Sequence, residues 1–249
     1  MDIDLIMFDW GGTLVSIDGQ NAALGKAAKA VADVLLGGGD DAVVVQLVER
    51  AIAAERAAAA DLQHREVDLA VLLADWLAEH GGTTEPAQIE RAVQAVGECW
   101  IGAGLKPYPG AIDVVRQLRE AGYRTGLVSN VWIPQAFCLR ELDRQGFGPL
   151  MDFTVFSSQV GYRKPSPVIY DAALAAAFPN GRPADLSRVL FVGDWPRGDV
   201  IAPAGLGMRT ALVASPPGTW PESDYDAAQP DIRIDAVSEL PAQLDRFKS

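Results

Sequence analysis

Short apolar runs alternate with amphipathic stretches over most of the second half of the chain. The continuous apolar runs, which are typical of buried strands, cover residues 3–8, 124–130, 151–158, 188–194 and 208–214. Apolar residues at helical spacing occupy residues 111–122, 134–146 and 165–178, and a last short strand and helix are expected at 230–234 and 237–247. This alternation predicts an α/β fold, a doubly wound parallel Rossmann-like core with right-handed crossovers.

A purely helical pattern interrupts this alternation between residues 16 and 108. Its amphipathic, alanine-rich segments cover residues 21–36, 42–62, 66–80 and 86–100, separated by glycine-containing breaks at 37–41 and 80–86. We therefore expect residues 1–15 and 109–249 to form the core and residues 16–108 to form an inserted all-helical domain. Residues 215–230 are the only long stretch without a regular pattern, and we expect them to wrap the surface.

Composition narrows the class of protein. Of 249 residues, 49% are hydrophobic, and the net charge of −12 offers no basic surface for nucleic acid or anionic membranes. No run of about 18 apolar residues could span a bilayer, and the acidic N-terminus lacks the features of a signal peptide, so we expect a cytoplasmic protein. Cys99 and Cys138 are expected to be reduced thiols, and His64 and His80 to be helix-surface residues.

Polar residues follow three of the predicted strands. Asp9 follows the first, Ser129 ends the strand at 124–130, and Asp194 ends the strand at 188–194. In an open parallel sheet, ligands bind beyond the carboxyl ends of the strands, where residues distant in sequence converge. Lys164 follows the strand at 151–158 closely enough to reach the same edge. The sequence therefore predicts a site at this edge of the sheet.

The ordered set of motifs resembles the haloacid dehalogenase-like hydrolase superfamily, over essentially the whole chain. The first motif of that family, Asp-x-Asp-x-Thr, is matched by DWGGT at residues 9–13 except at its second Asp, where Gly11 stands. LVSN supplies Ser129 and Asn130, GYRKPSP supplies Lys164, and VGDWPRGDV supplies Asp194 and Asp199. The helical insertion lies where members with a helical cap of the first type carry that cap.

The resemblance implies a role for each of these residues. Asp9 is the expected nucleophile, which forms an aspartyl-phosphate with a small phosphorylated substrate. Mg²⁺ is the expected cofactor, bound by Asp9, Asp194, Asp199 and the carbonyl of Gly11. Lys164 and Ser129 complete the catalytic set, and Gly12, Ser129, Asn130 and Lys164 are expected to bind the phosphoryl oxygens. Asp199 could instead only cap a helix that begins there.

Gly11 leaves the chemistry open. The second Asp of the family protonates the leaving group and then activates water, and glycine can do neither, at a usual cost of about 10² to 10⁴ in rate. Four alternatives follow. The chain is either a phosphatase, for good leaving groups or with an acid from the cap, or a 2-haloacid dehalogenase. Otherwise it is a phosphonoacetaldehyde hydrolase, which would need a cap lysine such as Lys26 or Lys29, or a weakened binding protein, natural or engineered. Of these, the phosphatase is the preferred interpretation. For Trp10, Trp132 and Trp195, near the motifs, packing beneath the sheet edge is preferred over an aromatic wall around the site.

Overall fold

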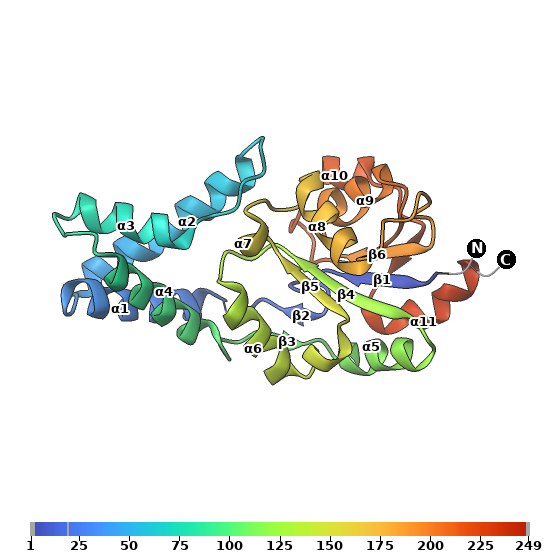
Figure 1. The fold of residues 1–249 in the computed structure, drawn as a ribbon, viewed down its shortest axis with the longest axis horizontal. Helices are drawn as coiled ribbons and strands as arrows, with labels where there is room; N and C mark the ends of the chain where they lie inside the picture. Colours follow the sequence, from blue (N-terminus) through green and yellow to red (C-terminus); the bar gives the residue numbers. More distant parts are fainter. Residues whose placement is uncertain (1–2, 19, 248–249) are drawn as a thin grey trace.

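A six-stranded parallel sheet forms the centre of the protein in a computed structural model, which describes residues 3–18 and 20–247 (Figure 1). The strand order is β5-β4-β1-β6-β7-β8, with every neighbouring pair parallel. The strands are β1 Leu5–Phe8, β4 Arg124–Ser129, β5 Phe153–Phe156, β6 Val189–Gly193, β7 Arg209–Val213 and β8 Ile232–Ile234. The predicted α/β Rossmann-like fold is confirmed.

Helices cover both faces of the sheet. In Figure 1, α8 (Pro167–Ala177), α9 (Ala202–Gly205) and α10 (Glu222–Ala227) lie above the sheet, and α5 (Ala111–Glu120), α6 (Gln135–Gln145) and α11 (Leu240–Gln243) lie below it. Short turns complete this part: α7 Ser157–Val160, the π-helical turn η2 Pro196–Ile201, and the 3₁₀ turns η1 Gly148–Leu150, η3 Val237–Glu239 and η4 Leu244–Phe247. Residues 215–230 were expected to be irregular, but part of this segment forms the helix α10.

Alternate strand residues pack on opposite faces, as the two-residue period of a strand requires. One apolar cluster holds the side chains Ile6, Phe8, Leu127, Leu190 and Val192 together with residues of α5 and α6. The other holds Leu5, Met7, Val128, Val189 and Phe191 together with residues of α8. Both faces are therefore buried, which explains why these strands are continuous apolar runs in the sequence.

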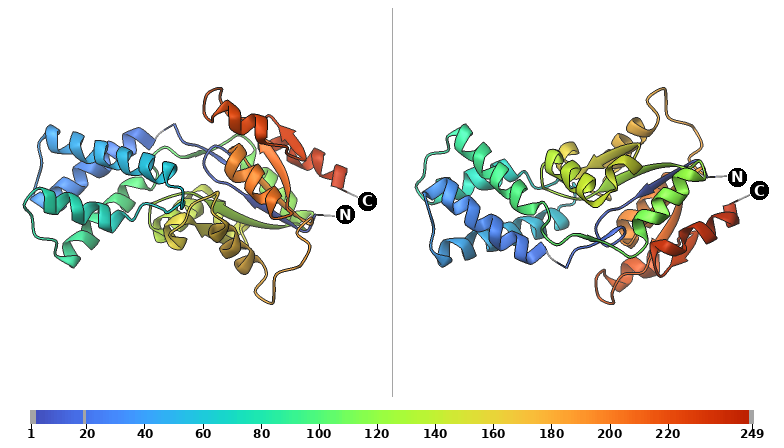
Figure 2. Two further views of the ribbon diagram at one scale, coloured as in Figure 1. Left: turned by 90° about the horizontal axis from the view of Figure 1, so that it is seen from above. Right: turned by 90° about the horizontal axis from the view of Figure 1, so that it is seen from below.

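Four helices lie beyond the carboxyl ends of the strands, at one end of the molecule (Figures 1 and 2). They are α1 Gln20–Leu36, α2 Asp41–Ala60, α3 Leu69–Glu79 and α4 Pro86–Trp100. Asp40 and Asp68 begin α2 and α3 by accepting hydrogen bonds from backbone amides of the first turn. No strand lies between residues 20 and 105 of the described chain, and a two-stranded ladder of β2 (Val15–Ser16) with β3 (Lys106–Pro107) lies where the helices join the sheet. The domain boundaries at residues 16 and 108 stay a prediction.

The four helices and the sheet share one apolar core. The cluster below the sheet continues through Trp10, Phe137 and Ile133 into α4 and the other helices. Gly97 of α4 lies against the Phe137 ring of α6, because a Cβ at Gly97 would be 2.3 Å from that ring. Within the described residues, no helix is long and apolar enough to cross a membrane, and Cys99 and Cys138 are free, as expected.

The contact at Gly97 gives a first prediction. Gly97→Ala should lower the free energy of unfolding by about 1–3 kcal/mol, because its methyl group overlaps the buried Phe137 ring. The matched control is Gly25→Ala in α1, where nothing lies within 4 Å of the added carbon. The control should gain up to about 1 kcal/mol of helix propensity. Urea unfolding of the three proteins measures both effects, and a Gly97→Ala protein as stable as the control would show that the helices adjust at no cost.

Candidate active site

The carboxyl ends of three adjacent strands bring the predicted residues together. Phe8 of β1 is in register with Leu127 of β4 and Val192 of β6, so the strands end at the same level. Asp9, Ser129 and Asp194 follow at this edge, each less than a tenth exposed. Together with Gly11, Gly12, Asn130 and Lys164 they line one pocket of about 330 Å³. The structure thus gathers these sequence-predicted residues around one space.

Lys164 is the buried cation of this site. Its Nζ lies 2.9 Å from Oδ1 of Asp9 and 2.7 Å from Oδ1 of Asp199, and the residue is 1% exposed. Burial lowers the pKa of Lys164, but the charges of Asp199 and Asp9 outweigh burial and raise it above its usual value, so the ammonium stays charged. The side chain of Asn130 accepts a hydrogen bond from the Lys164 amide (2.7 Å) and donates one to its carbonyl (3.2 Å). Asn130 therefore positions the lysine.

Asp194 is held by three donors. Thr13 Oγ1 donates to its Oδ1 at 3.3 Å, and Ser215 Oγ and Trp220 Nε1 donate to its Oδ2 at 2.9 and 3.2 Å. Gly12, with φ of +82°, lies so close that a Cβ there would be 2.6 Å from the carboxylate. A glycine is therefore required beside Asp194 for both conformation and space.

Asp199 lies in the η2 turn and is fully buried. Its Oδ1 accepts from Lys164, and its Oδ2 accepts a hydrogen bond of 2.9 Å from the Trp195 amide. A Cβ on Gly193 would be 2.2 Å from this carboxylate, so the strand end must be glycine. Asp199 thus holds the turn that leads into α9 and also pairs with the lysine, so helix capping does not account for it alone.

Three carboxylates crowd around a single ammonium group. Oxygen atoms of Asp9, Asp194 and Asp199 lie within 4.8 Å of one another. Burial first, and then the charge of Asp9, raise the pKa of Asp194 to about 6. Burial, together with the charges of Asp9 and Asp194, raises the pKa of Asp199 to about 7, despite the opposing effect of Lys164. Hard carboxylate oxygens with excess negative charge fit a divalent cation such as Mg²⁺.

Residues from the helical insertion also line this pocket. Glu55, Ala58 and Ala59 of α2 and His64 of the following loop face it. His64, expected on a helix surface, lies instead in the loop between α2 and α3 and has a φ of +56°. His80 ends α3, stacks on Trp76 and contacts the Trp76 carbonyl through Nδ1 at 2.8 Å.

The loop that carries His64 is joined to the loop that precedes Lys164. The Arg163 amide donates to the His64 carbonyl at 2.8 Å, and the Glu66 amide donates to the Gly161 carbonyl at 2.9 Å. Ser157 Oγ donates to Glu66 Oε2 at 2.5 Å. Burial raises the pKa of Glu66, although the charge of Arg163 opposes this. The helical insertion is therefore hydrogen-bonded to the core beside Lys164.

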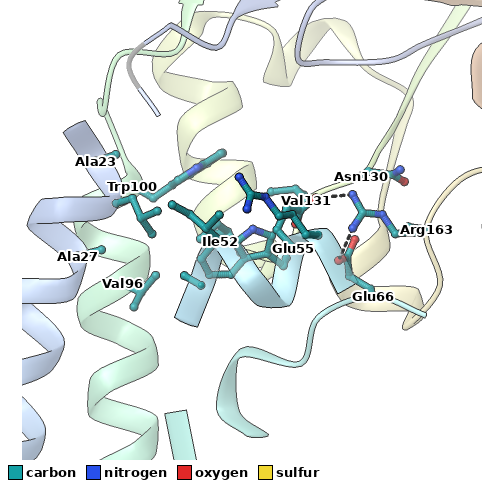
Figure 3. A pocket seen from close by; sticks show the side chains of 15 residues that line it. Ala23, Ala27, Ile52, Glu55, Glu66, Val96, Trp100, Asn130, Val131 and Arg163 are labelled. Carbon is teal, nitrogen blue, oxygen red and sulfur yellow. Dashed lines mark hydrogen bonds and ion pairs between the residues drawn. The ribbon is translucent and has the colours of Figure 1, made fainter. Parts of the chain in front are cut away.

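Arg163 forms a polar cluster with two glutamates, shown in Figure 3. Its Nη2 lies 2.6 Å from Glu55 Oε1, and its Nη1 lies 3.6 Å from Glu66 Oε1. The cluster stands between the pocket around Asp9 and a second pocket of about 370 Å³. The sequence did not single out Arg163, Glu55 or Glu66, because nothing in their spacing links the helical segments to the sheet.

The tryptophans near the motifs divide into two groups. Trp10 is 2% exposed and packs against Trp100 and Phe156, as the packing interpretation expected. Trp195 stacks on Trp220 and lines the pocket around Asp9, and Trp132 lines the second pocket, so these two form parts of pocket walls.

Lys26 and Lys29 lie on α1 and line neither pocket. Ser215, which fixes Asp194, could have been found as a polar residue just after β7.

Comparison with known proteins agrees with this geometry. A family model described as haloacid dehalogenase-like hydrolase matches residues 3–207. The pyrimidine 5'-nucleotidase YjjG of Escherichia coli is 32% identical over 130 residues, which are 52% of each chain. The glyceraldehyde 3-phosphate phosphatase of Methanopyrus kandleri is 30% identical over 160 residues, covering 64% of this chain and 65% of that protein. The matched stretches thus span between half and two thirds of these curated relatives.

Solved structures share the fold along the whole chain. A 2-haloacid dehalogenase from Pseudomonas syringae superposes with a TM-score of 0.67 at 22% identity, covering 98% of this chain and 99% of that one. The HAD-hydrolase YfnB from Bacillus subtilis, bound to magnesium, gives a TM-score of 0.62 at 18% identity, covering 98% and 100%. The fold is therefore shared by neighbours described as hydrolases of different chemistry.

The crowded carboxylates give a prediction on stability against pH. In excess chelator, Asp194 and Asp199 should lower the free energy of unfolding as the pH rises from about 4 to about 7. Asp194 and Asp199 keep their protons up to a pKa of about 6 and about 7, compared with 3.8 for an ordinary aspartate. The native state therefore binds more protons than the unfolded chain in this window, and stability falls as they are lost. Calorimetric melting of Asp194→Asn should show a smaller fall than the unmodified protein; parallel curves would contradict the assigned shifts.

Cation binding gives a separate prediction. Isothermal titration with Mg²⁺ near pH 7.5 should show binding that is lost in Asp194→Asn, because this removes one of the three carboxylates expected to bind the ion. At a hundred times the dissociation constant, Mg²⁺ should stabilise the unmodified protein by about 2.7 kcal/mol. Asp171→Asn, which changes an exposed aspartate on α8 paired with Arg182, is the matched control and should bind normally. Unchanged affinity in Asp194→Asn would remove Asp194 from the ligand set.

Proposed function

Because the chain belongs to the haloacid dehalogenase-like hydrolase family, we propose that it is a Mg²⁺-dependent phosphatase that acts on a small organophosphate. The observation that carries the proposal is the Asp9–Lys164–Asp199 ion-pair chain beside Asp194. Asp9 is the one member of this group that follows the central strand β1 and faces the open pocket. The phosphatase names of several relatives agree with this choice.

In the proposed reaction, Asp9 attacks the phosphorus of the ester. A bond forms between its carboxylate oxygen and phosphorus, the ester P–O bond breaks, and the leaving oxygen departs with the electron pair. Water then attacks the phosphorus of the aspartyl-phosphate, which breaks the bond to Asp9, releases inorganic phosphate and restores the carboxylate.

Lys164 orients Asp9 through the 2.9 Å contact and offsets the negative charge of the phosphoryl group. The Ser129 hydroxyl and the backbone amide of Asn130 would bind the phosphoryl oxygens. The Gly12 amide, expected from the sequence in the same role, donates to the Val15 carbonyl at 2.8 Å instead.

Asp9, Asp194, Asp199 and the Gly11 carbonyl would hold the metal ion. When bound, Mg²⁺ would supply positive charge that draws an anionic ester toward an anionic carboxylate. Thr13, Ser215 and Trp220 would hold the Asp194 carboxylate in place for this role. Residues 16–108 would act as a cap of the first helical type, closing over the site and selecting the leaving group.

Two alternatives predicted from the sequence find less support. A haloacid dehalogenase needs no metal ligands, whereas this chain keeps three carboxylates within 4.8 Å of one another. A phosphonoacetaldehyde hydrolase would need a cap lysine at the site, and neither Lys26 nor Lys29 lines the pocket. The phosphatase therefore remains the function that the geometry supports best.

Gly11 provides the test. Without a side chain at position 11, turnover should depend steeply on the leaving group: an aryl or acyl phosphate expels a stabilised anion, whereas an alkyl phosphate expels an alkoxide that needs a proton. Gly11→Asp should raise the rate on alkyl phosphates by up to about 10² to 10⁴ and should help aryl phosphates less. The site has room, because a Cβ at Gly11 meets only Cγ2 of Ile17, at 3.0 Å, and Ile17 is 46% exposed.

The measurement is kcat/KM for alkyl and aryl phosphates in both proteins, with folding checked by circular dichroism. Equal alkyl and aryl rates in the unmodified protein would mean that another acid acts, and His64, which lines the same pocket, is the side chain to replace. His80→Gln is then the matched control for His64→Gln, because His80 stacks on Trp76 and does not line this pocket. Halide release from 2-haloacids in excess chelator, without phosphatase activity, would contradict the phosphoryl-transfer proposal.

A further inference from the structure

A second pocket adjoins the pocket around Asp9. It has a volume of about 370 Å³ and lies between α1, α2, α4 and the loop that follows β4 (Figure 3). Both pockets share the lining residues Glu55, Asn130 and Arg163. A phosphoryl group bound at Asp9 would therefore direct the rest of its molecule toward this space.

The walls of the second pocket are largely apolar. They include the side chains Leu24, Ile52, Val96, Trp100, Trp132 and Ile133. A sugar leaving group would place hydroxyls against carbon, at a cost of about 1–3 kcal/mol for each one left without a partner. An apolar cavity of about 150 Å³ already accommodates benzene, so the larger volume here is sufficient for one or two substituted rings. Tryptophan side chains offer flat surfaces for stacking against such rings.

The rim of the pocket carries two buried polar atoms without a hydrogen-bond partner. They are Oε2 of Glu55 and Nη1 of Arg163, and the Arg163 side chain is only 12% exposed. Nη1 faces Glu66 at 3.6 Å, which is beyond hydrogen-bonding distance. A hydroxyl substituent on a ring could donate to the glutamate and accept from the arginine. The rim is thus suited to a polar substituent on an otherwise apolar group.

The missing acid at Gly11 independently favours the same class of molecule. A phenolic oxygen leaves as a stabilised anion and needs little protonation, unlike the alkoxide of a sugar or glycerol ester. We propose that the second pocket holds the leaving group of the substrate and that this group is an aromatic ring, so that the substrate is an aryl phosphate. The assignment rests on the proposed phosphatase function. The phenolate that leaves takes its proton from water.

Binding of phosphonates, which cannot be hydrolysed, separates recognition of the ring from leaving-group chemistry. In the presence of Mg²⁺, 1-naphthylmethylphosphonate should bind about 10- to 100-fold more tightly than methylphosphonate, because the ring buries apolar surface. Isothermal titration calorimetry measures both dissociation constants. The matching kinetic comparison is kcat/KM for benzyl phosphate against ethyl phosphate. Both leaving groups are alcohols, so the two esters differ in the ring and not in the class of leaving group.

Two variants locate the effect. Ile52→Asn places an uncharged polar group on the pocket wall at a residue that is 36% exposed, and Ala51→Leu fills part of the pocket. Both should reduce the advantage of the naphthyl compound at least about tenfold and leave methylphosphonate binding unchanged. Val45→Asn, on the same helix and 53% exposed but outside the pocket, is the matched control and should keep the full advantage.

The outcomes separate this assignment from the proposed function. Equal binding of the two phosphonates, or an advantage of the naphthyl compound that persists in both variants, would overturn the assignment of the pocket to an aromatic leaving group. If alkyl phosphates are hydrolysed all the same, the phosphatase proposal stays intact. If the naphthyl compound binds more tightly and both variants remove this advantage, the result supports the assignment of the pocket, whether or not any phosphate ester is hydrolysed. If no phosphate ester is hydrolysed, only the phosphatase proposal is contradicted.

Discussion

The burial of three carboxylates around one ammonium group is the constraint on which the site depends. Asp9, Asp194 and Asp199 bring three negative charges to a space where Lys164 supplies one positive charge. Such crowding is unfavourable unless hydrogen bonds, protons or a cation compensate for it. The surrounding sequence is specialised accordingly: Gly12 and Gly193 make room for the carboxylates, and Ser215 and Trp220 donate to Asp194. The raised pKa values of Asp194 and Asp199 measure what remains uncompensated in the protein alone.

The sheet and the candidate site at its edge could be predicted from the sequence because both follow from a simple pattern. A strand buried on both faces is a continuous apolar run, and the first polar residue after it marks the carboxyl end. This pattern alone is sufficient to locate Asp9, Ser129 and Asp194 at the edge of the sheet. Lys164 and Asp199 lie outside the strands, and Asp199 was identified only through the resemblance to a family.

Most of the contacts that the sequence did not reveal come from loops. Residues 61–68 follow an alanine-rich helix, and the helical pattern placed the next helix at residue 66, three residues before it begins at Leu69. His64 and Glu66 were therefore not expected to contact the core. Trp220 lies in a segment without periodicity, and only the fold brings its indole to Asp194. Such contacts depend on tertiary structure, for which local periodicity carries no signal.

The helical insertion contacts the loop that leads into Lys164. Arg163, the residue before Lys164, donates its amide to His64 and its guanidinium to Glu55. The same insertion shares an apolar cluster with the sheet through Trp10 and Phe137. A molecule in the second pocket would contact Arg163 directly, and the next residue in the chain, Lys164, contacts Asp9. Such a molecule would therefore lie one residue along the chain from Lys164.

Gly11 and the second pocket would restrict the substrate through separate physical effects. The absence of an acid acts on the transition state, where the charge on the leaving oxygen develops, and so it affects turnover. The apolar wall acts on the bound molecule through the surface that it removes from water, and so it affects binding as well. Neither effect requires the other, since Gly11 lies at the end of β1 and the wall is formed mainly by the helical insertion. Because two distant parts of the chain would exclude polar alkyl esters for different reasons, the proposed selectivity does not depend on a single side chain.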